Sequence, residues 1–325
     1  MENPKYRRCL PQLNDEYLLT DGGLETTMIF HYGLDLPLFA AFTLLRSDWG
    51  QTALRLYYES YIKVARSQNL GLILDSPTWR ASERWGSQLG YSQQDLVKAN
   101  QQSIEMLFEL REAFEDDRPF VVSGNVGPYG DGYAPDELLD PQDAADYHSA
   151  QIETFAHAGV DMISAITMTH TGEAIGINRA CARRGVPLVL SFTVETDGRL
   201  PSGQSLGDAI DEVDADLSRG PAYYMINCAH PDHFRPVLES NEKWRSRIGG
   251  LRTNASRKSH AELDEAETLD EGNPLELAQQ HKELMAYLPK LRVFGGCCGT
   301  DHRHVGAIGR VCLGKSSELI GLKAS

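Results

Sequence analysis

Residues 291–300 read Leu-Arg-Val-Phe-Gly-Gly-Cys-Cys-Gly-Thr. The first four residues favour a short strand, because they are mainly apolar. The two glycines allow a sharp turn, and a helix-like pattern follows over residues 303–313. The stretch therefore predicts a strand, a turn and a helix, with two adjacent cysteines in the turn.

The same order of apolar run, polar turn and amphipathic segment recurs along the chain. The apolar runs are residues 17–20, 70–75, 120–124, 160–166, 187–192, 223–227, 248–252 and 291–294. The helical patterns cover residues 52–68, 92–114, 141–158, 171–184, 205–217, 231–239, 274–287 and 303–313. Continuous apolar strands that alternate with helices are typical of a parallel sheet covered by helices. Eight cycles predict an α/β fold, a single-domain (β/α)8 TIM barrel over residues 1–325, with a doubly wound sheet as the alternative.

Polar residues stand at or just after the ends of the predicted strands. They are Asp21, Asp75, Asn125, Thr167, Thr193, Cys228, Asn254 and Cys297. In a barrel these strand ends meet in one mouth, where catalytic groups collect. Cys228 and Cys297 are therefore expected to lie close together.

The cysteines point to a metal site. A disulfide between Cys297 and Cys298 is unfavourable, because their Cα atoms are about 3.8 Å apart across a trans peptide, below the usual disulfide range. Together with Cys228 they offer three thiolates, which leave one position of a tetrahedral zinc ion open, as in catalytic sites. We predict that Cys228, Cys297 and Cys298 bind a catalytic Zn²⁺; an inert or redox-active cysteine pair is the alternative.

The composition excludes several classes of protein. Lys and Arg number 31 and Asp and Glu 46, so the formal charge is −15, and no convincing basic patch suggests nucleic-acid binding. No apolar run is long enough to cross a membrane, and residues 1–8 lack the apolar centre of a secretory signal. Six cysteines in 325 residues do not form a disulfide scaffold. We expect a cytoplasmic protein with reduced thiols and small-molecule partners; the oligomeric state is left open.

An acidic, polar insertion near residues 255–273 interrupts the seventh cycle. It is interpreted as a solvated loop or short helix over the barrel mouth, or as a surface without a role. His230, two residues after Cys228, is interpreted as a solvated loop histidine rather than as a fourth ligand. His302 is a candidate cap of the last helix.

The first strand runs into Asp21-Gly22-Gly23-Leu24-Glu25-Thr26. The glycines permit close approach to a ligand. We predict that Asp21 binds a substrate ammonium group, with Glu25 beside it. An ordinary acidic turn is the alternative.

Several motifs together resemble one enzyme family. They are Asp21-Gly22-Gly23, residues 124–130 (Gly-Asn-Val-Gly-Pro-Tyr-Gly), Ser191-Phe192-Thr193, Asn227-Cys228 and residues 295–300 (Gly-Gly-Cys-Cys-Gly-Thr). From about residue 18 to 308 the chain resembles the homocysteine S-methyltransferases, which include S-methylmethionine-dependent enzymes and betaine–homocysteine methyltransferase. The resemblance implies a (β/α)8 barrel, zinc on the three cysteines, Asp21 near the amino-acid substrate, and methylation of homocysteine to methionine.

The chain departs from this family at two places. The family usually has Glu-Thr at the end of the fourth strand, where the Glu holds the amino-acid substrate, whereas this chain has Ile166-Thr167. Thr167 remains as a candidate substrate contact. A Tyr-Pro-Asn segment after the seventh strand is replaced by residues 251–254, in which Arg252 is a candidate for binding a substrate carboxylate. The zinc chemistry is expected to be kept, with homocysteine or a related thiol as the acceptor.

In the expected mechanism a zinc-bound thiolate attacks the methyl group of an onium donor, either S-methylmethionine, S-adenosylmethionine or betaine. Trp79, Tyr129 and Tyr133 are candidates for facing the donor cation. Two alternatives are a zinc-binding barrel hydrolase, with Asp75 or Glu195 as the base, and a family member that has lost homocysteine methylation.

Overall fold

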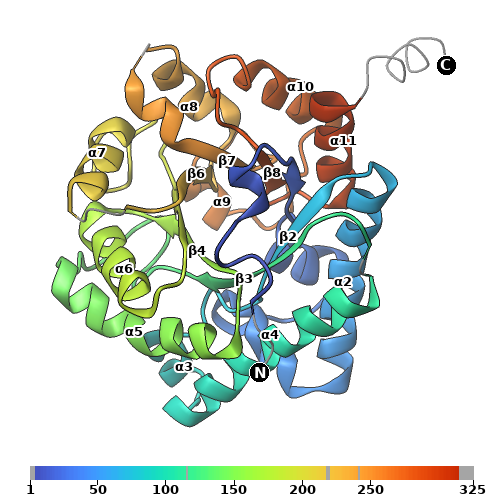
Figure 1. Cartoon of the computed structure of the whole chain (residues 1–325), viewed down its shortest axis with the longest axis vertical. Helices are drawn as coiled ribbons and strands as arrows, with labels where there is room; N and C mark the ends of the chain where they lie inside the picture. The colour runs from blue at the N-terminus through green and yellow to red at the C-terminus, as the bar shows by residue number, and fades with distance from the viewer. Residues whose placement is uncertain (1–3, 115, 217–219, 241, 315–325) are drawn as a thin grey trace.

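Eight parallel strands close into a barrel, in the order in which they occur along the chain (Figure 1). The computed structural model describes residues 4–114, 116–216, 220–240 and 242–314. The strands are β1 (Leu18–Leu19), β2 (Gly71–Asp75), β3 (Phe120–Val126), β4 (Met162–Met168), β5 (Leu188–Phe192), β6 (Tyr223–Asn227), β7 (Ile248–Thr253) and β8 (Val293–Gly296). The first strand, β1, pairs with both β2 and β8, which closes the sheet and excludes the doubly wound alternative. The predicted (β/α)8 barrel is confirmed.

The helices surround the barrel. They are α1 (Leu24–Thr26), α2 (Asp48–Ser67), α3 (Glu83–Gln88), α4 (Gln93–Ala113), α5 (Pro141–Ala158), α6 (Thr171–Arg184), α7 (Leu206–Asp216), α8 (Pro231–Leu238), α9 (His260–Asp264), α10 (Pro274–Leu284) and α11 (His302–Leu313). Short 3₁₀ segments are η1 (Pro11–Leu13), η3 (Pro37–Phe39), η4 (Ala41–Arg46) and η5 (Lys243–Arg247), and η2 (Thr27–His31) is a π-helical turn. The eight predicted helices are confirmed to within a few residues, and α9 is the short helix that was one interpretation of the insertion at residues 255–273, while α1 and α3 were not predicted. The expected end of one helix at residue 217 lies outside the described residues.

Local sequence signals fix several helix ends, as α5 illustrates. The carboxylate of Asp140 accepts hydrogen bonds from the backbone N–H groups of Gln142 and Asp143, at 2.8 and 2.9 Å. Pro141 takes the first helical position, where no N–H donor is needed. Gly159 ends the helix with a φ of 91°, a left-handed conformation that glycine adopts without strain.

Apolar side chains fill the amino-terminal half of the barrel interior. They are Leu18, Ile73, Val121, Met162, Val189, Tyr223, Met225 and Val293. A second, larger apolar cluster lies between the strands and the surrounding helices. Because the interior is packed at this end, open space remains at the carboxyl ends of the strands.

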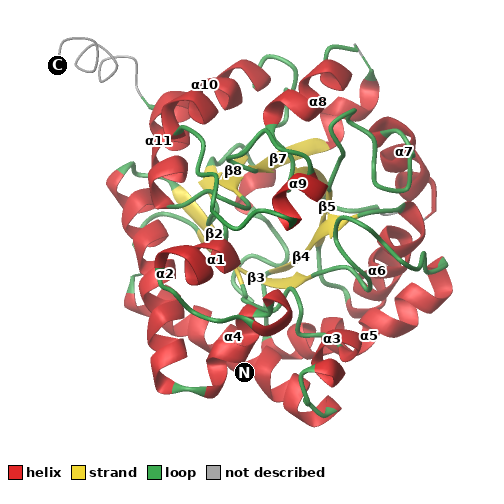
Figure 2. Ribbon diagram, turned by 180° about the vertical axis from the view of Figure 1, so that it is seen from behind, coloured by secondary structure: helices red, strands yellow, loops and turns green. Residues whose placement is uncertain are grey.

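The two ends of the barrel are covered by different segments. At the amino-terminal end, the backbone N–H of Tyr6 donates to Asp161 at 2.8 Å, and Arg7 donates to the carbonyl of Val160 at 2.9 Å. At the opposite end, α1 and α9 lie over the strands (Figure 2). The segment before β1 therefore seals the closed end of the barrel.

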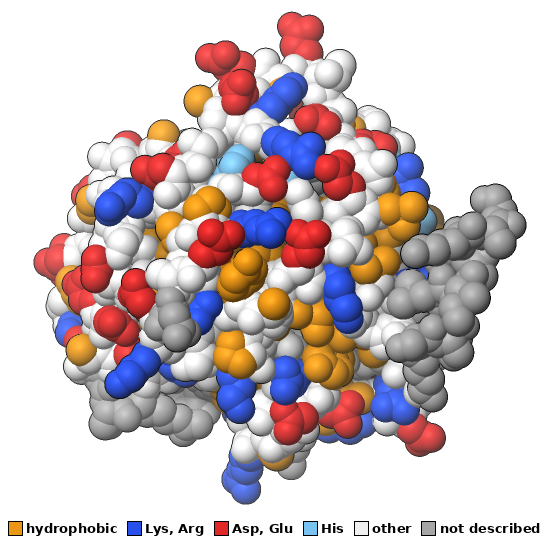
Figure 3. Space-filling view, turned by 90° about the horizontal axis from the view of Figure 1, so that it is seen from above, with side chains coloured by type: hydrophobic (Ala, Val, Ile, Leu, Met, Phe, Trp, Pro, Cys, Tyr) orange, Lys and Arg blue, Asp and Glu red, His pale blue; other side chains and the backbone are white. Residues whose placement is uncertain are grey.

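The outer surface is mixed in charge. On the face drawn in Figure 3, acidic and basic side chains alternate, and the basic ones do not gather into a patch. Among the described residues, no helix combines the length and the apolar character that a membrane crossing requires.

The contacts of Asp161 lead to a stability prediction. Asp161 is fully buried, and its carboxylate accepts hydrogen bonds from Arg111 at 3.0 Å and from the N–H groups of Tyr6 and Val122. Asp161→Ala should lower the unfolding free energy by about 3–5 kcal/mol, because it leaves buried donors without their carboxylate. Asp146→Ala, at an exposed pair 3.9 Å from Arg183, should change it by about 0–1 kcal/mol. Urea denaturation measures both, and equal losses would contradict the assignment.

Candidate active site

A cavity of about 450 Å³ opens at the carboxyl ends of the strands. Six polar residues from the strand ends line it, namely Asp21, Asp75, Asn125, Thr167, Cys228 and Cys297. Thr193 and Asn254, which were expected at the same mouth, are buried but are not part of the cavity wall. The barrel therefore brings most of the predicted strand-end residues to one cavity.

Three cysteine sulphurs meet in the wall of this cavity. The Sγ atom of Cys228 lies 2.6 Å from that of Cys297 and 3.9 Å from that of Cys298. All three sulphurs lie within 4.8 Å of one another, and all three cysteines are free. Cys228 is buried, whereas Cys297 and Cys298 are partly exposed toward the cavity. The structure thus brings together the three residues that the sequence predicted as metal ligands.

The backbone turns that carry these cysteines depend on close approach. A Cβ atom on Gly296 would lie 1.9 Å from Oγ1 of Thr300, so this position requires glycine. The Thr300 hydroxyl donates to the carbonyl of Cys297 at 2.7 Å and holds the turn closed. Cys228 itself has a φ of 54°, a strained left-handed conformation for a residue with a side chain. These features fold the two cysteine-bearing turns against each other.

A second strained residue, Thr167, is held in place beside the sulphurs. Thr167 has a φ of 64°, which is an outlier for a β-branched residue, and the register of β4 against β5 shifts at this point. The amide of Asn227 accepts a hydrogen bond from the Thr167 N–H and donates one to the Thr167 hydroxyl, both at 2.9 Å. Asn227 therefore fixes the strained turn while its chain neighbour, Cys228, carries the first sulphur.

The three thiols are close enough to hydrogen-bond to one another. Hydrogen bonds from Cys228 and Cys298 hold the pKa of the Cys297 thiol well below its usual range, and the nearby Arg252 acts in the same direction. A soft cation can take the place of the thiol protons, because thiolates are its preferred ligands.

Tyr133, from the loop after β3, faces the sulphur cluster. Its hydroxyl lies 3.4 Å from the Cys298 sulphur and 3.6 Å from the Cys228 sulphur. Burial, followed by the nearby thiols, raises the pKa of Tyr133 well above its ordinary value, so the hydroxyl keeps its proton. The ring of His260 stacks on Tyr133, with the centroids 4.0 Å apart.

His260, at the start of α9, ties the acidic insertion to the turn that carries Cys228. One ring nitrogen lies 3.0 Å from the carboxylate of Glu195, and the other lies 2.6 Å from the carbonyl of Cys228. Burial alone would lower the pKa of His260, but hydrogen bonds to these two acceptors raise it above its ordinary value. His260 therefore favours the protonated form and anchors α9 over the cavity.

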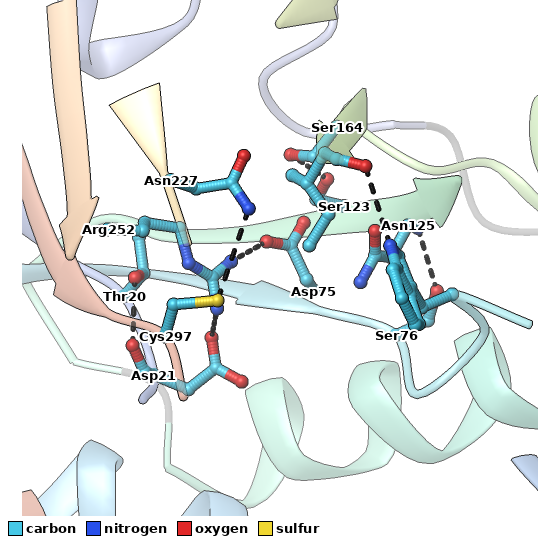
Figure 4. Close-up of polar contacts among 12 residues, drawn as sticks. Thr20, Asp21, Asp75, Ser76, Ser123, Asn125, Ser164, Asn227, Arg252 and Cys297 are labelled. Carbon is cyan, nitrogen blue, oxygen red and sulfur yellow. Dashed lines mark hydrogen bonds and ion pairs between the residues drawn. The ribbon is translucent and has the colours of Figure 1, made fainter. Parts of the chain in front are cut away.

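A buried cation lies between two aspartates near the cysteines (Figure 4). The guanidinium of Arg252 pairs with Asp21 and Asp75, and its Nε donates to the carbonyl of Gly296 at 3.3 Å. Burial raises the pKa of Asp21 to about 6, although Arg252 and a hydrogen bond from Tyr57 oppose this shift. In this structure the carboxylates that Arg252 binds are therefore those of the protein.

Glu25 and Ile166 occupy other parts of the cavity wall. Glu25 is half-buried on α1, and burial raises the pKa of its carboxyl to about 7. Ile166 is 8% exposed and presents an apolar side chain. The four residues predicted to contact substrate, Asp21, Glu25, Thr167 and Arg252, all line the cavity, and their contact with substrate stays a prediction.

Aromatic residues form another part of the wall. Trp79, Trp85 and Tyr133 line the cavity, whereas Tyr129 lies outside it with its ring against Tyr147, 4.8 Å away. The guanidinium of Arg80 lies 4.2 Å from the ring centroid of Trp79 and 3.4 Å from that of Trp85. Of the three aromatic candidates for the donor site, Trp79 and Tyr133 are therefore suitably placed.

The acidic segment contributes directly to the cavity. Leu263 and Asp264 of α9, and Leu269 and Asp270 after it, line the wall. The segment is therefore more than a solvated surface loop.

Sequence reasoning missed His260. The signal that could have revealed it is a histidine inside an insertion that follows a strand at the barrel mouth.

The two other histidine interpretations were wrong. His230 is 3% exposed, and its Nδ1 accepts a hydrogen bond from the N–H of Asp232, so it caps α8 and is not a solvated loop residue. The N-cap of α11 is Asp301 and not His302. Asp301 forms a capping box with His304.

Comparison with known proteins identifies related molecules. The homocysteine S-methyltransferase family matches residues 18–312. The metallated form of the homocysteine methyltransferase MmuM from Escherichia coli is similar with a TM-score of 0.72 and 20% identity, over 93% of this chain and 98% of that one. The oxidized form gives a TM-score of 0.73 at 20% identity, over 93% and 97%. At this identity the structural likeness establishes a shared fold. No curated protein sequence matches the chain.

The ion set around Arg252 leads to a pH-dependent prediction. Arg252→Met should lower the unfolding free energy by about 3–5 kcal/mol at pH 8, because two buried carboxylates lose their cation. The loss should shrink as the pH falls toward 6, because without the cation Asp21 takes up its proton at a higher pH than the pKa of about 6 that it has beside Arg252. Below that pH Asp21 is protonated in both folded proteins, so further acidification affects the variant and the unaltered protein alike.

The measurement is urea denaturation at pH 8 and pH 5. Arg55→Met, at an exposed pair with Glu109, serves as the control and should cost about 0–1 kcal/mol at both pH values. A loss for Arg252→Met that is the same at both pH values would contradict the assignment.

Proposed function

Because this chain belongs to the homocysteine S-methyltransferase family, we propose that it transfers a methyl group from an onium donor to homocysteine or a related thiol. Its activity is therefore that of an S-methyltransferase. The observation that carries the proposal is the cluster of three free thiols at the wall of a cavity large enough for two small molecules. Free thiols also suit a reducing compartment such as the cytoplasm.

The donor set fits a zinc ion. Cys228, Cys297 and Cys298 offer three soft ligands that converge within 4.8 Å, and three protein ligands leave one coordination position for a substrate. When bound, zinc supplies a Lewis acid that keeps the acceptor sulphur as a thiolate at neutral pH. Its binding to these three residues is part of the proposal.

The surrounding residues hold this ligand set in position. Asn227 fixes the turn at Thr167, next to Cys228 in space, through two hydrogen bonds. The hydroxyl of Tyr133 lies within hydrogen-bond distance of the Cys228 and Cys298 sulphurs and helps to hold them in place. Preorganisation of this kind lowers the barrier, since the reacting groups need not be ordered during the reaction.

The charge of the cavity favours a cationic donor. Its acidic lining residues are Asp21, Glu25, Asp75, Asp131, Asp264 and Asp270, against the two cations Arg80 and Arg252. A sulfonium or quaternary ammonium group is attracted to such a wall and to the rings of Trp79 and Tyr133. The acceptor sulphur forms a bond to the methyl carbon as the methyl–onium bond breaks, and the electron pair leaves on the neutral thioether or amine.

The hydrolase alternative finds less support. Asp75 pairs with Arg252, and Glu195 accepts a hydrogen bond from His260, so both candidate bases are engaged with cations. A carboxylate that is held by such a partner is less free to accept a proton from a water molecule. Methyl transfer, in contrast, needs no base beyond the bound thiolate.

The decisive experiment is methyl transfer to homocysteine by zinc-loaded protein. S-methylmethionine, S-adenosylmethionine and betaine are offered separately, and methionine is followed by mass spectrometry. Cys298→Ala should lose both methionine formation and bound zinc, because the ion keeps only two thiolates. Cys181→Ala, which removes a buried thiol on α6, should keep one zinc per chain and its activity. Undiminished methyl transfer by metal-free Cys298→Ala protein would refute the mechanism.

A further inference from the structure

Two buried oxygen atoms in the cavity wall lack a hydrogen-bond donor. Asp75 is 3% exposed; one of its carboxylate oxygens pairs with Arg252, and the other, Oδ1, has no partner among the described residues. Asn125 is 8% exposed, and its amide oxygen likewise has no partner in the described part of the chain. Both residues line the cavity. Two unpartnered acceptors therefore share one binding space.

These two acceptors lie on neighbouring strands. Asp75 ends β2 in register with Ser123 of β3, and Asn125, two residues further along, projects from the same face of β3 as Ser123. Figure 4 shows Asp75 with Arg252 on one side and Asn125 on the other. Leaving such buried acceptors unsatisfied costs about 1–3 kcal/mol each. A ligand that carries N–H donors would remove this cost on binding.

The two protein cations at the cavity differ in how fully they are engaged. The terminal nitrogens of Arg252 pair with Asp21 and Asp75, and Nε donates to Gly296. Arg80 donates to the carbonyl of Gly130 at 3.2 Å and lies against the rings of Trp79 and Trp85, while its buried Nε has no hydrogen-bond partner among the described residues. The carboxylate of Asp75 is thus held in place by Arg252 and keeps one oxygen for an ammonium group.

We propose that Asp75 and Asn125 form a binding site for the primary ammonium group of the acceptor, which is an aminothiol. This inference rests on the proposed methyl transfer to a thiol. A primary ammonium can donate to both oxygens, whereas a quaternary ammonium or sulfonium donor has no N–H group and cannot. Ile166 in the same cavity offers only an apolar side chain, so Asp75 and Asn125 are the residues that recognise the amino group in this proposal.

The proposal is tested with homocysteine and two analogues, each of which lacks one of its charged groups. Homocysteine carries both charges, 3-aminopropane-1-thiol lacks the carboxylate, and 4-sulfanylbutanoate lacks the amine. With zinc-loaded protein, kcat/KM and calorimetric Kd are measured for each. Loss of the amine should weaken recognition about tenfold or more, because it removes hydrogen bonds between charged groups, whereas 3-aminopropane-1-thiol keeps these hydrogen bonds.

A pair of matched variants connects this preference to the site. Asn125→Leu should reduce the preference for the amine-bearing thiols about tenfold and leave 4-sulfanylbutanoate unchanged, because only the ammonium loses an acceptor. Asn178→Leu is the control: Asn178 is 3% exposed on α6, also has an unpartnered amide atom, and does not line this cavity. Asn178→Leu should leave the ranking of the three thiols by kcat/KM and by Kd unchanged. Thermal unfolding confirms that both variants are folded.

The outcomes separate this inference from the proposed function. If 4-sulfanylbutanoate is bound and methylated with the same efficiency as homocysteine, the ammonium site is refuted while methyl transfer stands. Equal losses for all thiols in Asn125→Leu would refute it as well. If no thiol is methylated, the proposed function fails. The calorimetric Kd values of the three thiols then test the ammonium site separately.

Discussion

The guanidinium of Arg252 is the charge on which the arrangement of the barrel mouth depends. It extends from β7 to Asp21 after β1, to Asp75 at the end of β2 and to the carbonyl of Gly296 in β8. Burying a cation costs several kcal/mol, which only close and well-directed partners offset. Since Cys297 directly follows Gly296, the same contacts that neutralise Arg252 also fix the strand end that carries the adjacent cysteines.

This ion set also determines the polarity of the binding space. One guanidinium between two carboxylates leaves a formal charge of −1, and Glu25 adds another acidic group that burial keeps near a pKa of 7. The donors of Arg252 point into the protein, while an oxygen of Asp75 and one of Asn125 remain without donors. A ligand therefore meets acceptors first, which favours cations at the place where a methyl donor and an acceptor must both bind.

Much of the fold and part of the site could be predicted from the sequence. Eight apolar runs with polar ends predicted the barrel, because a closed parallel sheet gathers such ends at one mouth. The convergence of Cys228, Cys297 and Cys298 followed from the same topology. The pairing of Arg252 with Asp21 and Asp75 could not be read from separation along the chain, and neither could the left-handed Thr167. Both depend on side-chain directions that only the assembled barrel fixes.

The same topology explains how the proposed recognition of an amino group is compatible with Ile166. Parallel strands converge at the mouth, so a carboxylate lost from the end of β4 can be replaced by one from another strand without moving the sulphurs. Asp75 of β2 is such a group, held in place by Arg252 and flanked by Asn125 of β3. Under the proposed function, a substitution that looks disabling in one motif changes only the direction from which the ligand is bound, because the cluster of Cys228, Cys297 and Cys298 is unaffected by it.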